Sequence, residues 1–126
     1  MAGEQILVVE DNEKNMKLFR DVLQATGFRT LEAASGSEAV ELATEHAPDL
    51  VLLDIQLPDL DGVEVLRRLR GNERTGAIPI LAVTAQAMLG DRERFLAAGF
   101  DGYVSKPVNI VELIGTVRQH CDGSRL

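Results

Sequence analysis

The sequence has 126 residues, of which 45% are hydrophobic and 26% are charged, a composition typical of one globular domain. Twenty acidic and thirteen basic side chains give a net charge of −7, which argues against nucleic acid as a direct partner. No apolar stretch approaches the roughly 18 residues of a membrane span, and the N-terminus has no secretory pattern, so we expect a cytoplasmic protein.

Strand patterns and helix patterns alternate along the chain. The expected order is a strand at residues 6–9, a helix at 13–26, a strand at 29–33, a helix at 35–46, a strand at 50–53, a helix at 63–70, a strand at 80–83, a helix that includes Arg92, Phe95 and Leu96, a strand at 102–105, and a helix at 109–119. Asn12, Ser35 and Asn109 are predicted to begin helices, and Gly27 is predicted to end one.

Such strand-helix units predict a doubly wound, parallel α/β sheet. We expect a single domain over residues 1–126, with an ordered core from about residue 4 to residue 121. Inward-facing apolar positions recur at helical spacing. They include Met16, Phe19, Val22 and Leu23 in the first helix and Val40 and Ala43 in the second.

Reactive polar residues follow four of the predicted strands. The first strand leads into Glu10 and Asp11, the third into Asp54, the fourth into Thr84 and the fifth into Lys106. The carboxyl ends of parallel strands share one edge of the sheet, and open α/β sheets bind their ligands at that edge. Three carboxylates, a hydroxyl and an ammonium group are therefore expected in one crevice, which suggests a cation and a phosphoryl group.

Four segments carry a resemblance to a known family, namely VVEDN at residues 8–12, LLDIQLPDLDG at 52–62, AVTA at 82–85 and SKP at 105–107. Together they resemble the receiver domain of two-component response regulators, and the match spans nearly the whole chain. The resemblance implies a CheY-like (βα)5 fold with five parallel strands in the order 2-1-3-4-5. Single-domain regulators of the DivK type are the most similar, and receiver modules of hybrid histidine kinases share similar strings.

By this resemblance, Asp54 is the phosphoacceptor, and a carboxylate can form an aspartyl phosphate by attacking phosphorus. The resemblance also implies that Asp11, Asp54 and the backbone carbonyl of Gln56 bind Mg²⁺ or Mn²⁺, with Glu10 acting mainly through water. Crowded carboxylates have raised pKa values unless a cation is present, and a hard divalent ion with oxygen ligands removes this conflict. The family often has Asp where Glu10 stands. Two other acidic residues of the same loop, Asp59 and Asp61, are interpreted as cap or turn residues.

The resemblance implies further roles at the ends of the last two strands. Lys106 pairs with Asp54 and then with a phosphoryl oxygen, and the bond to Pro107 is cis. Thr84 is the switch hydroxyl, and Tyr103 is the aromatic residue that rotates inward when Thr84 moves. A half-buried strand aromatic without a switch role is an equally good interpretation of Tyr103. Neutral amides, Gln56 and Gln86, occupy positions that tune the lifetime of the phosphoryl group.

The predicted function is a phosphorylation switch. A sensor histidine kinase or a histidine phosphotransfer protein donates a phosphoryl group to Asp54. The face formed by the fourth helix, the fifth strand and the fifth helix then changes its affinity for a downstream protein. We expect no turnover of an external substrate, no DNA-binding output domain, no insertion into a membrane, and either a monomer or a weak, phosphorylation-dependent dimer.

Two alternative functions compete with this prediction. The chain could be a receiver module of a hybrid histidine kinase, which the motifs do not distinguish from a stand-alone regulator. It could also be an Mg²⁺-dependent phosphohydrolase with an Asp nucleophile, but such enzymes carry a D-x-D motif after the first strand. Here Glu10, Asp11 and Asn12 follow that strand, so the second Asp of the motif is missing.

Overall fold

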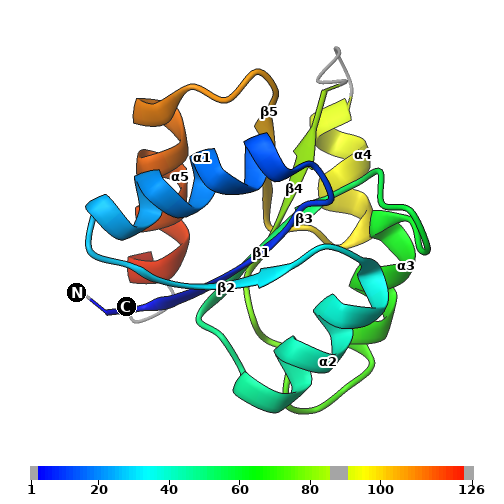
Figure 1. Cartoon of the computed structure of the whole chain (residues 1–126). Coiled ribbons are helices and arrows are strands. Elements are labelled where there is room, and N and C mark those ends of the chain that lie inside the picture. Colours follow the sequence, from blue (N-terminus) through cyan, green and yellow to red (C-terminus); the bar gives the residue numbers. More distant parts are fainter. Residues whose placement is uncertain (1–2, 86–90, 124–126) are drawn as a thin grey trace.

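The computed structural model of the chain describes residues 3–85 and 91–123, and the side chains of residues 91, 92, 122 and 123 lie outside this description. Strands and helices alternate through the described residues (Figure 1). Their order is β1 (Gln5–Val9), α1 (Glu13–Ala25), β2 (Arg29–Ala33), α2 (Gly36–His46), β3 (Leu50–Asp54), α3 (Gly62–Arg70), β4 (Ile80–Thr84), α4 (Asp91–Ala98), β5 (Gly102–Ser105) and α5 (Ile110–Gly123).

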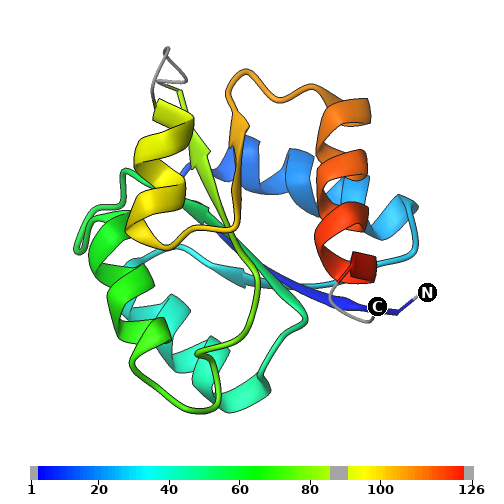
Figure 2. The ribbon, with the colours of Figure 1, turned by 180° about the vertical axis from the view of Figure 1, so that it is seen from behind.

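The strands form one parallel sheet in the order β2-β1-β3-β4-β5, which confirms the predicted doubly wound topology. Helices α1 and α5 cover one face of the sheet, and α2, α3 and α4 cover the other (Figures 1 and 2). All five strands therefore end at the same edge of the sheet, and β4 reaches this edge at the top of Figure 1. None of the helices in the described part of the chain is long and apolar enough to cross a bilayer.

Each face of the sheet has its own apolar core. Phe19 of α1 and Leu113 of α5 belong to the core on one face, and Leu66 of α3 and Phe95 of α4 belong to the core on the other. Every residue of β3 and β4 is buried. Central parallel strands that are covered on both sides need apolar residues at successive positions, which explains the continuous apolar runs in the sequence.

Side-chain caps begin the helices at the predicted residues. The Asn12 side chain accepts a hydrogen bond from the Asn15 N–H at 3.1 Å, Ser35 accepts one from Glu38 at 3.2 Å, and Asn109 accepts one from Glu112 at 3.0 Å. Asp61 caps α3 in the same way. These side chains satisfy backbone donors that have no partner within their own helix.

Several details differ from the sequence prediction. Helix α1 ends at Ala25 with Thr26 as its C-cap, and α5 continues to Gly123 instead of ending near Gln119. The buried residues Leu113, Val117 and Cys121 are spaced four apart, so the apolar side of α5 extends one turn further than predicted. In α2 the buried positions are Gly36, Ala39 and Ala43, whereas Val40 is only partly buried.

At the opposite edge of the sheet, Arg70 joins the end of α3 to the loop before β4 and to the turn before β5. Its guanidinium donates to the carbonyl oxygens of Gly76 at 3.2 Å and Ile78 at 2.7 Å in the loop before β4. It also donates to the carbonyl of Gly99 at 3.1 Å and to the Asp101 carboxylate at 2.8 Å. The same Asp101 carboxylate accepts the Ile80 N–H, so this network fixes where β4 begins.

Replacing Arg70 with alanine is expected to lower the free energy of unfolding by about 2 kcal/mol, because the four oxygens lose a charged donor in a partly buried position. Urea unfolding followed by circular dichroism measures this change. Arg68→Ala is the matched control, since Arg68 is 47% exposed and pairs only across one helical turn with Glu64 in the described structure. Equal losses in the two variants would contradict the proposed contribution of Arg70.

Candidate functional site

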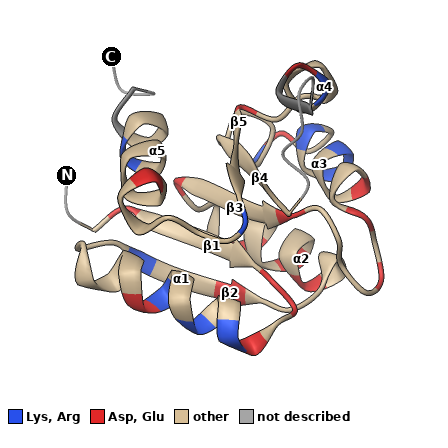
Figure 3. Ribbon diagram, turned by 90° about the horizontal axis from the view of Figure 1, so that it is seen from above, with Lys and Arg blue, Asp and Glu red and all other residues tan. Residues whose placement is uncertain are grey.

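The carboxyl edge of the sheet brings together polar side chains from four strand ends. Glu10 follows β1, Asp54 ends β3, Thr84 ends β4, and Lys106 follows β5. The Lys106 Nζ lies 3.1 Å from Oδ2 of Asp54 and 3.0 Å from Oε1 of Glu10. Figure 3, which looks down on this edge, shows acidic segments in the loops that follow β1 and β3. Residues separated by up to 96 positions thus form one charged cluster.

Three carboxylates form the acidic part of this cluster. Glu10, Asp11 and Asp54 each offer one oxygen, and these oxygens all lie within 4.8 Å of one another. Glu10 and Asp54 are buried, whereas Asp11 is exposed. Anionic groups at such distances repel one another, so a cation with oxygen ligands would stabilise the arrangement.

The surroundings of Glu10 show most clearly that these carboxylates repel one another. Its Oε2 accepts the Asn12 N–H at 3.2 Å, whereas its buried Oε1 has no aligned hydrogen-bond donor among the described residues. The Lys106 ammonium near Oε1 supplies opposite charge rather than an aligned hydrogen bond. Burial first, and the nearby Asp54 carboxylate second, raise the pKa of Glu10 above its ordinary value. A buried carboxylate that shares one ammonium with Asp54 and has an oxygen without an aligned hydrogen bond fits the residues to a divalent cation.

Asp54 has a partner at each of its oxygens. Oδ1 accepts the backbone N–H of Gln56 at 2.9 Å, and Oδ2 accepts the Lys106 ammonium at 3.1 Å. Burial alone would lower the pKa of Lys106, but the nearby carboxylates of Glu10 and Asp54 outweigh burial and raise it. Lys106 therefore stays protonated beside Asp54, where it can offset negative charge.

A small hollow of about 80 Å³ opens beside Asp54. Its walls include Gln56, Thr84, Arg94 and Lys106. Thr84 is buried, and its carbonyl accepts the Lys106 N–H at 2.8 Å, so the ends of β4 and β5 are held together. The Lys106–Pro107 peptide bond is cis. This hollow is the space in which a group attached to Asp54 would meet both a hydroxyl and an ammonium.

Tyr103 lies apart from the charged cluster. It is half-buried on β5, and its ring centroid lies 6.2 Å from that of Phe95 on α4, with the ring planes at 47°. The ring packs against the core on the α2–α4 side of the sheet. This packing suits both interpretations of Tyr103, the strand aromatic and the switch residue. Gln86, which is expected together with Gln56 to tune the lifetime of the phosphoryl group, lies outside the described residues.

Sequence reasoning missed Arg94 at the site and the helix that Asp59 caps. Arg94 of α4 lines the hollow beside Asp54, and its guanidinium carbon lies 5.2 Å from the centre of the Phe95 ring. Asp59, interpreted from the sequence as a cap or turn residue, caps the start of α2, which lies 23 residues earlier in the chain. Arg94 could have been flagged as the residue before the inward-facing Phe95, whereas nothing local in the sequence indicates the partner of Asp59.

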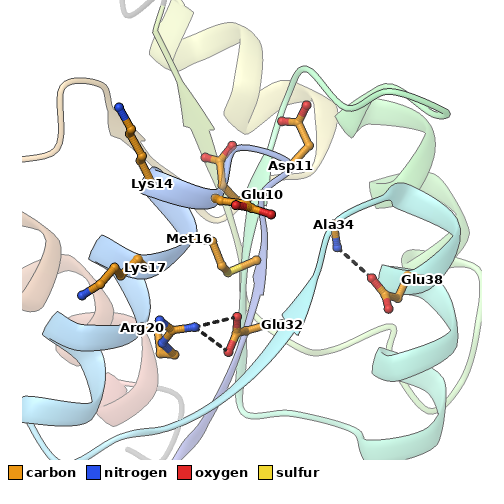
Figure 4. A pocket seen from close by; sticks show the side chains of 10 residues that line it. Glu10, Asp11, Lys14, Met16, Lys17, Arg20, Glu32, Ala34 and Glu38 are labelled. Carbon is orange, nitrogen blue, oxygen red and sulfur yellow. Dashed lines mark hydrogen bonds and ion pairs between the residues drawn. The ribbon is translucent and has the colours of Figure 1, made fainter.

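A larger hollow of about 570 Å³ adjoins the acidic cluster between α1 and β2 (Figure 4). Glu10 and Asp11 form one end of it, and an ion pair between Arg20 and Glu32, at 3.2 Å, forms part of its wall. In Figure 4 the Lys14 side chain extends away from Glu10. Charges of both signs line this hollow, so it does not select a ligand of one charge.

Comparisons with known proteins agree with this geometry. Residues 6–118 match the family described as the response regulator receiver domain. The chain belongs to this family. A polar-differentiation response regulator DivK from Brucella ovis is 48% identical over 117 residues, which cover 93% of this chain and 95% of the relative. The resemblance inferred from the sequence motifs is therefore confirmed.

Solved receiver domains share the fold. The receiver domain of the sensor histidine kinase PA1611 from Pseudomonas aeruginosa, crystallised with a magnesium ion in its active-site cleft, is 38% identical with a TM-score of 0.88. The match covers 96% of this chain and 99% of that one. The chemotaxis protein CheY4 of Vibrio cholerae is 26% identical with a TM-score of 0.87, over 94% and 98% of the two chains. This receiver domain thus resembles both free-standing regulators and kinase modules.

The raised pKa of Glu10 predicts a pH-dependent stability when no divalent cation is added. The folded state holds the protonated carboxyl more tightly than the unfolded chain does. The stabilising contribution is therefore present below the ordinary pKa of 4.5 and is lost as the pH rises through the raised value. We expect Glu10→Gln, which removes the ionisation, to raise the free energy of unfolding at pH 7 and to flatten its pH dependence above pH 4.5.

Urea unfolding in a chelating buffer at several pH values measures this effect. Glu41→Gln, at an exposed position of α2, is the matched control that removes the same charge away from the site. A Glu10→Gln variant that is no more stable than this control at pH 7 would show that the Glu10 carboxylate is not destabilising.

Proposed function

We propose that this receiver domain accepts a phosphoryl group on Asp54. The observation that carries the proposal is the placement of the Asp54 carboxylate between the Gln56 N–H and the Lys106 ammonium, beside two further carboxylates. The family belongs to two-component signalling, so the donor is a phosphohistidine of a sensor histidine kinase or of a histidine phosphotransfer protein.

The chemistry follows from the groups at the site. An oxygen of the Asp54 carboxylate attacks phosphorus, and a P–O bond forms as the P–N bond of the phosphohistidine breaks. The electron pair of that bond remains on the imidazole nitrogen of the donor, which takes up a proton from water. Lys106 offsets the negative charge that develops on the phosphoryl oxygens. Hydrolysis, in which water takes the phosphoryl group from Asp54, is the only other reaction that we propose for the domain.

Asp11, Asp54 and the backbone carbonyl of Gln56 would hold Mg²⁺ or Mn²⁺, with Glu10 acting mainly through water. The cluster of carboxylate oxygens and the buried Glu10 oxygen without an aligned donor support this assignment. A bound divalent ion supplies positive charge that lowers the repulsion between these carboxylates and an incoming phosphoryl group. The Glu10 side chain is one methylene longer than the Asp that the family often has, so we expect it to tune the affinity for the ion.

The signal leaves through the face formed by α4, β5 and α5. Thr84 bonds a phosphoryl oxygen, and Tyr103 repacks toward the space that Thr84 vacates. On this face a hollow of about 210 Å³ is lined by Leu96, Tyr103, Thr116 and His120, among other residues. Leu96 is 42% exposed there, which leaves apolar surface for a protein partner. Repacking of Tyr103 would change the shape of this face and hence its affinity.

The remaining properties follow from this function. We propose that the chain acts as one receiver domain in the cytoplasm, as a monomer or a weak phosphorylation-dependent dimer, without direct contact to nucleic acid. Its similarity to DivK favours a free-standing regulator, and its similarity to the PA1611 receiver domain keeps a module of a hybrid kinase as the alternative. In both cases the output is a change in protein–protein affinity.

Incubation with acetyl phosphate and Mg²⁺ is expected to add one phosphoryl group to the protein, because the Asp54 carboxylate is a nucleophile and the Lys106 ammonium lies beside it. Intact-mass spectrometry detects the adduct. Asp54→Asn should abolish it, whereas the control Asp61→Asn should retain it, since Asp61 caps α3 and an amide can also cap a helix. An adduct that survives Asp54→Asn would overturn the proposed function.

The chain contains one tyrosine, so the ring resonances of Tyr103 report directly on the switch. Phosphorylation of the wild-type protein is expected to shift these NMR resonances. Thr84→Ala should still be phosphorylated but should show little of the shift, because no hydroxyl moves toward the phosphoryl group. Thr30→Ala, on the edge strand β2, is the control. A full Tyr103 shift in phosphorylated Thr84→Ala would remove Thr84 from the switch.

A further inference from the structure

We propose that Asp59 is a positioning residue for the phosphorylation site, acting through the β3–α3 loop that carries Gln56. This inference rests on the proposed function of Asp54. Asp59 does not touch the charged cluster in the described structure. Instead, it fastens the loop to the first turn of α2, and the loop in turn contacts Asp54.

Asp59 accepts four hydrogen bonds, which we call the Asp59 cap. Its Oδ1 accepts the N–H groups of Gly36 at 2.8 Å and Leu60 at 2.9 Å. Its Oδ2 accepts the Ser37 N–H at 3.1 Å and the Ser37 hydroxyl at 2.7 Å. Gly36 and Ser37 are the first two residues of α2, so their N–H groups have no partner within the helix. A carboxylate from another loop therefore completes the capping of this helix.

These hydrogen bonds keep the carboxylate ionised. The Ser37 hydroxyl first, and the Gly36 N–H next, lower the pKa of Asp59 from 3.8 to about 2. The positive end of the α2 dipole acts in the same direction. At neutral pH the cap therefore consists of charge-assisted hydrogen bonds, which are stronger than neutral ones.

The packing around Gly36 shows that α2 and the loop are in close contact. A Cβ atom added at Gly36 would lie 2.8 Å from Cβ of Leu60 and 2.8 Å from Cγ2 of Val65. Real Cβ atoms do not approach other carbon atoms this closely, so a side chain at this position would push the loop away from α2. The glycine thus permits the approach that the Asp59 cap then fixes.

The base of the loop is closed by a second contact. The Gly62 N–H donates to the Ile55 carbonyl at 2.9 Å, and a Cβ at Gly62 would lie 2.8 Å from Cα of Ile55. The segment from Ile55 to Gly62 is therefore held at its base by its own backbone and at its tip by Asp59. Between these two points the loop packs through Leu57 and Leu60, which are partly buried.

Gln56 lies in this held segment, three residues before Asp59. Its N–H is the donor to Oδ1 of Asp54, and its carbonyl is the proposed ligand of the cation. Both groups belong to the backbone, so no side-chain rotamer can correct them if the loop shifts. Loss of the Asp59 cap should therefore loosen the orientation of Asp54 and weaken cation binding. Groups that orient metal ligands from outside the site have such effects.

The test compares Asp59→Ala with Ser35→Ala. Ser35 caps the same helix from its own segment through the Glu38 N–H, so its loss destabilises the start of α2 without removing the Asp59 cap. Two readouts are taken besides the free energy of unfolding. The first is the dissociation constant for Mn²⁺, measured by electron paramagnetic resonance. The second is the exchange rate of the Gln56 amide in the metal-free protein, measured by NMR.

Asp59→Ala is expected to weaken Mn²⁺ binding by about tenfold and to speed exchange of the Gln56 amide. Ser35→Ala should leave both unchanged at a similar loss of stability. Two milder variants cover the case in which Asp59→Ala does not fold. Asp59→Asn keeps a carbonyl acceptor and Ser37→Ala removes one donor, so both should give smaller effects in the same direction.

Equal effects of Asp59→Ala and Ser35→Ala on Gln56 exchange would overturn the inference, because they would show a purely structural role. An unchanged Gln56 amide in Asp59→Ala would overturn it as well. Failure of the proposed function is seen separately, as a wild-type protein that takes no phosphoryl group on Asp54. In that case the exchange measurement, which needs neither metal nor phosphoryl donor, still decides the role of Asp59.

Discussion

The placement of one ammonium group between two buried carboxylates governs the carboxyl edge of this receiver domain. Lys106 lies about equally far from Glu10 and Asp54, at 3.0 and 3.1 Å. Without the Lys106 ammonium, two buried carboxylates and a third nearby would have no opposite charge among the contacts described. With it, the excess negative charge is reduced but not cancelled. Burial, and then the neighbouring Asp54 carboxylate, still raise the pKa of Glu10. That residual charge suits the site to a divalent ion.

The backbone around this site is fixed by contacts between segments that are far apart in sequence. β4 and β5 meet where the Lys106 N–H bonds to the Thr84 carbonyl. The β3–α3 loop meets α2 through Asp59, and its Gln56 N–H meets Asp54. At the opposite edge, Arg70 fixes the start of β4. The reactive groups thus stand on a framework that is tied at both ends of the strands, which is what precise positioning requires.

Much of this architecture could be predicted because its signals are local. Continuous apolar runs in β3 and β4 indicate strands covered on both faces, and Asn12, Ser35 and Asn109 begin their helices as predicted. The predictions were wrong where burial depends on the neighbouring element. Helix α5 is longer than predicted because Cys121 packs in the core. Helix α2 buries Ala39 more deeply than Val40 because α2 packs closely on its neighbours.

The sequence by itself determined which reactive residues follow the strands, because the ends of parallel strands must share one edge. It also determined the family, because four motifs occur in register. Only the tertiary structure decided how these groups are paired. It gave Asp54 two partners, left one oxygen of Glu10 without an aligned donor, and brought Asp59 to α2 and Arg94 to the hollow beside Asp54. The physical reason is that such contacts depend on distances between elements, which packing sets and no local pattern encodes.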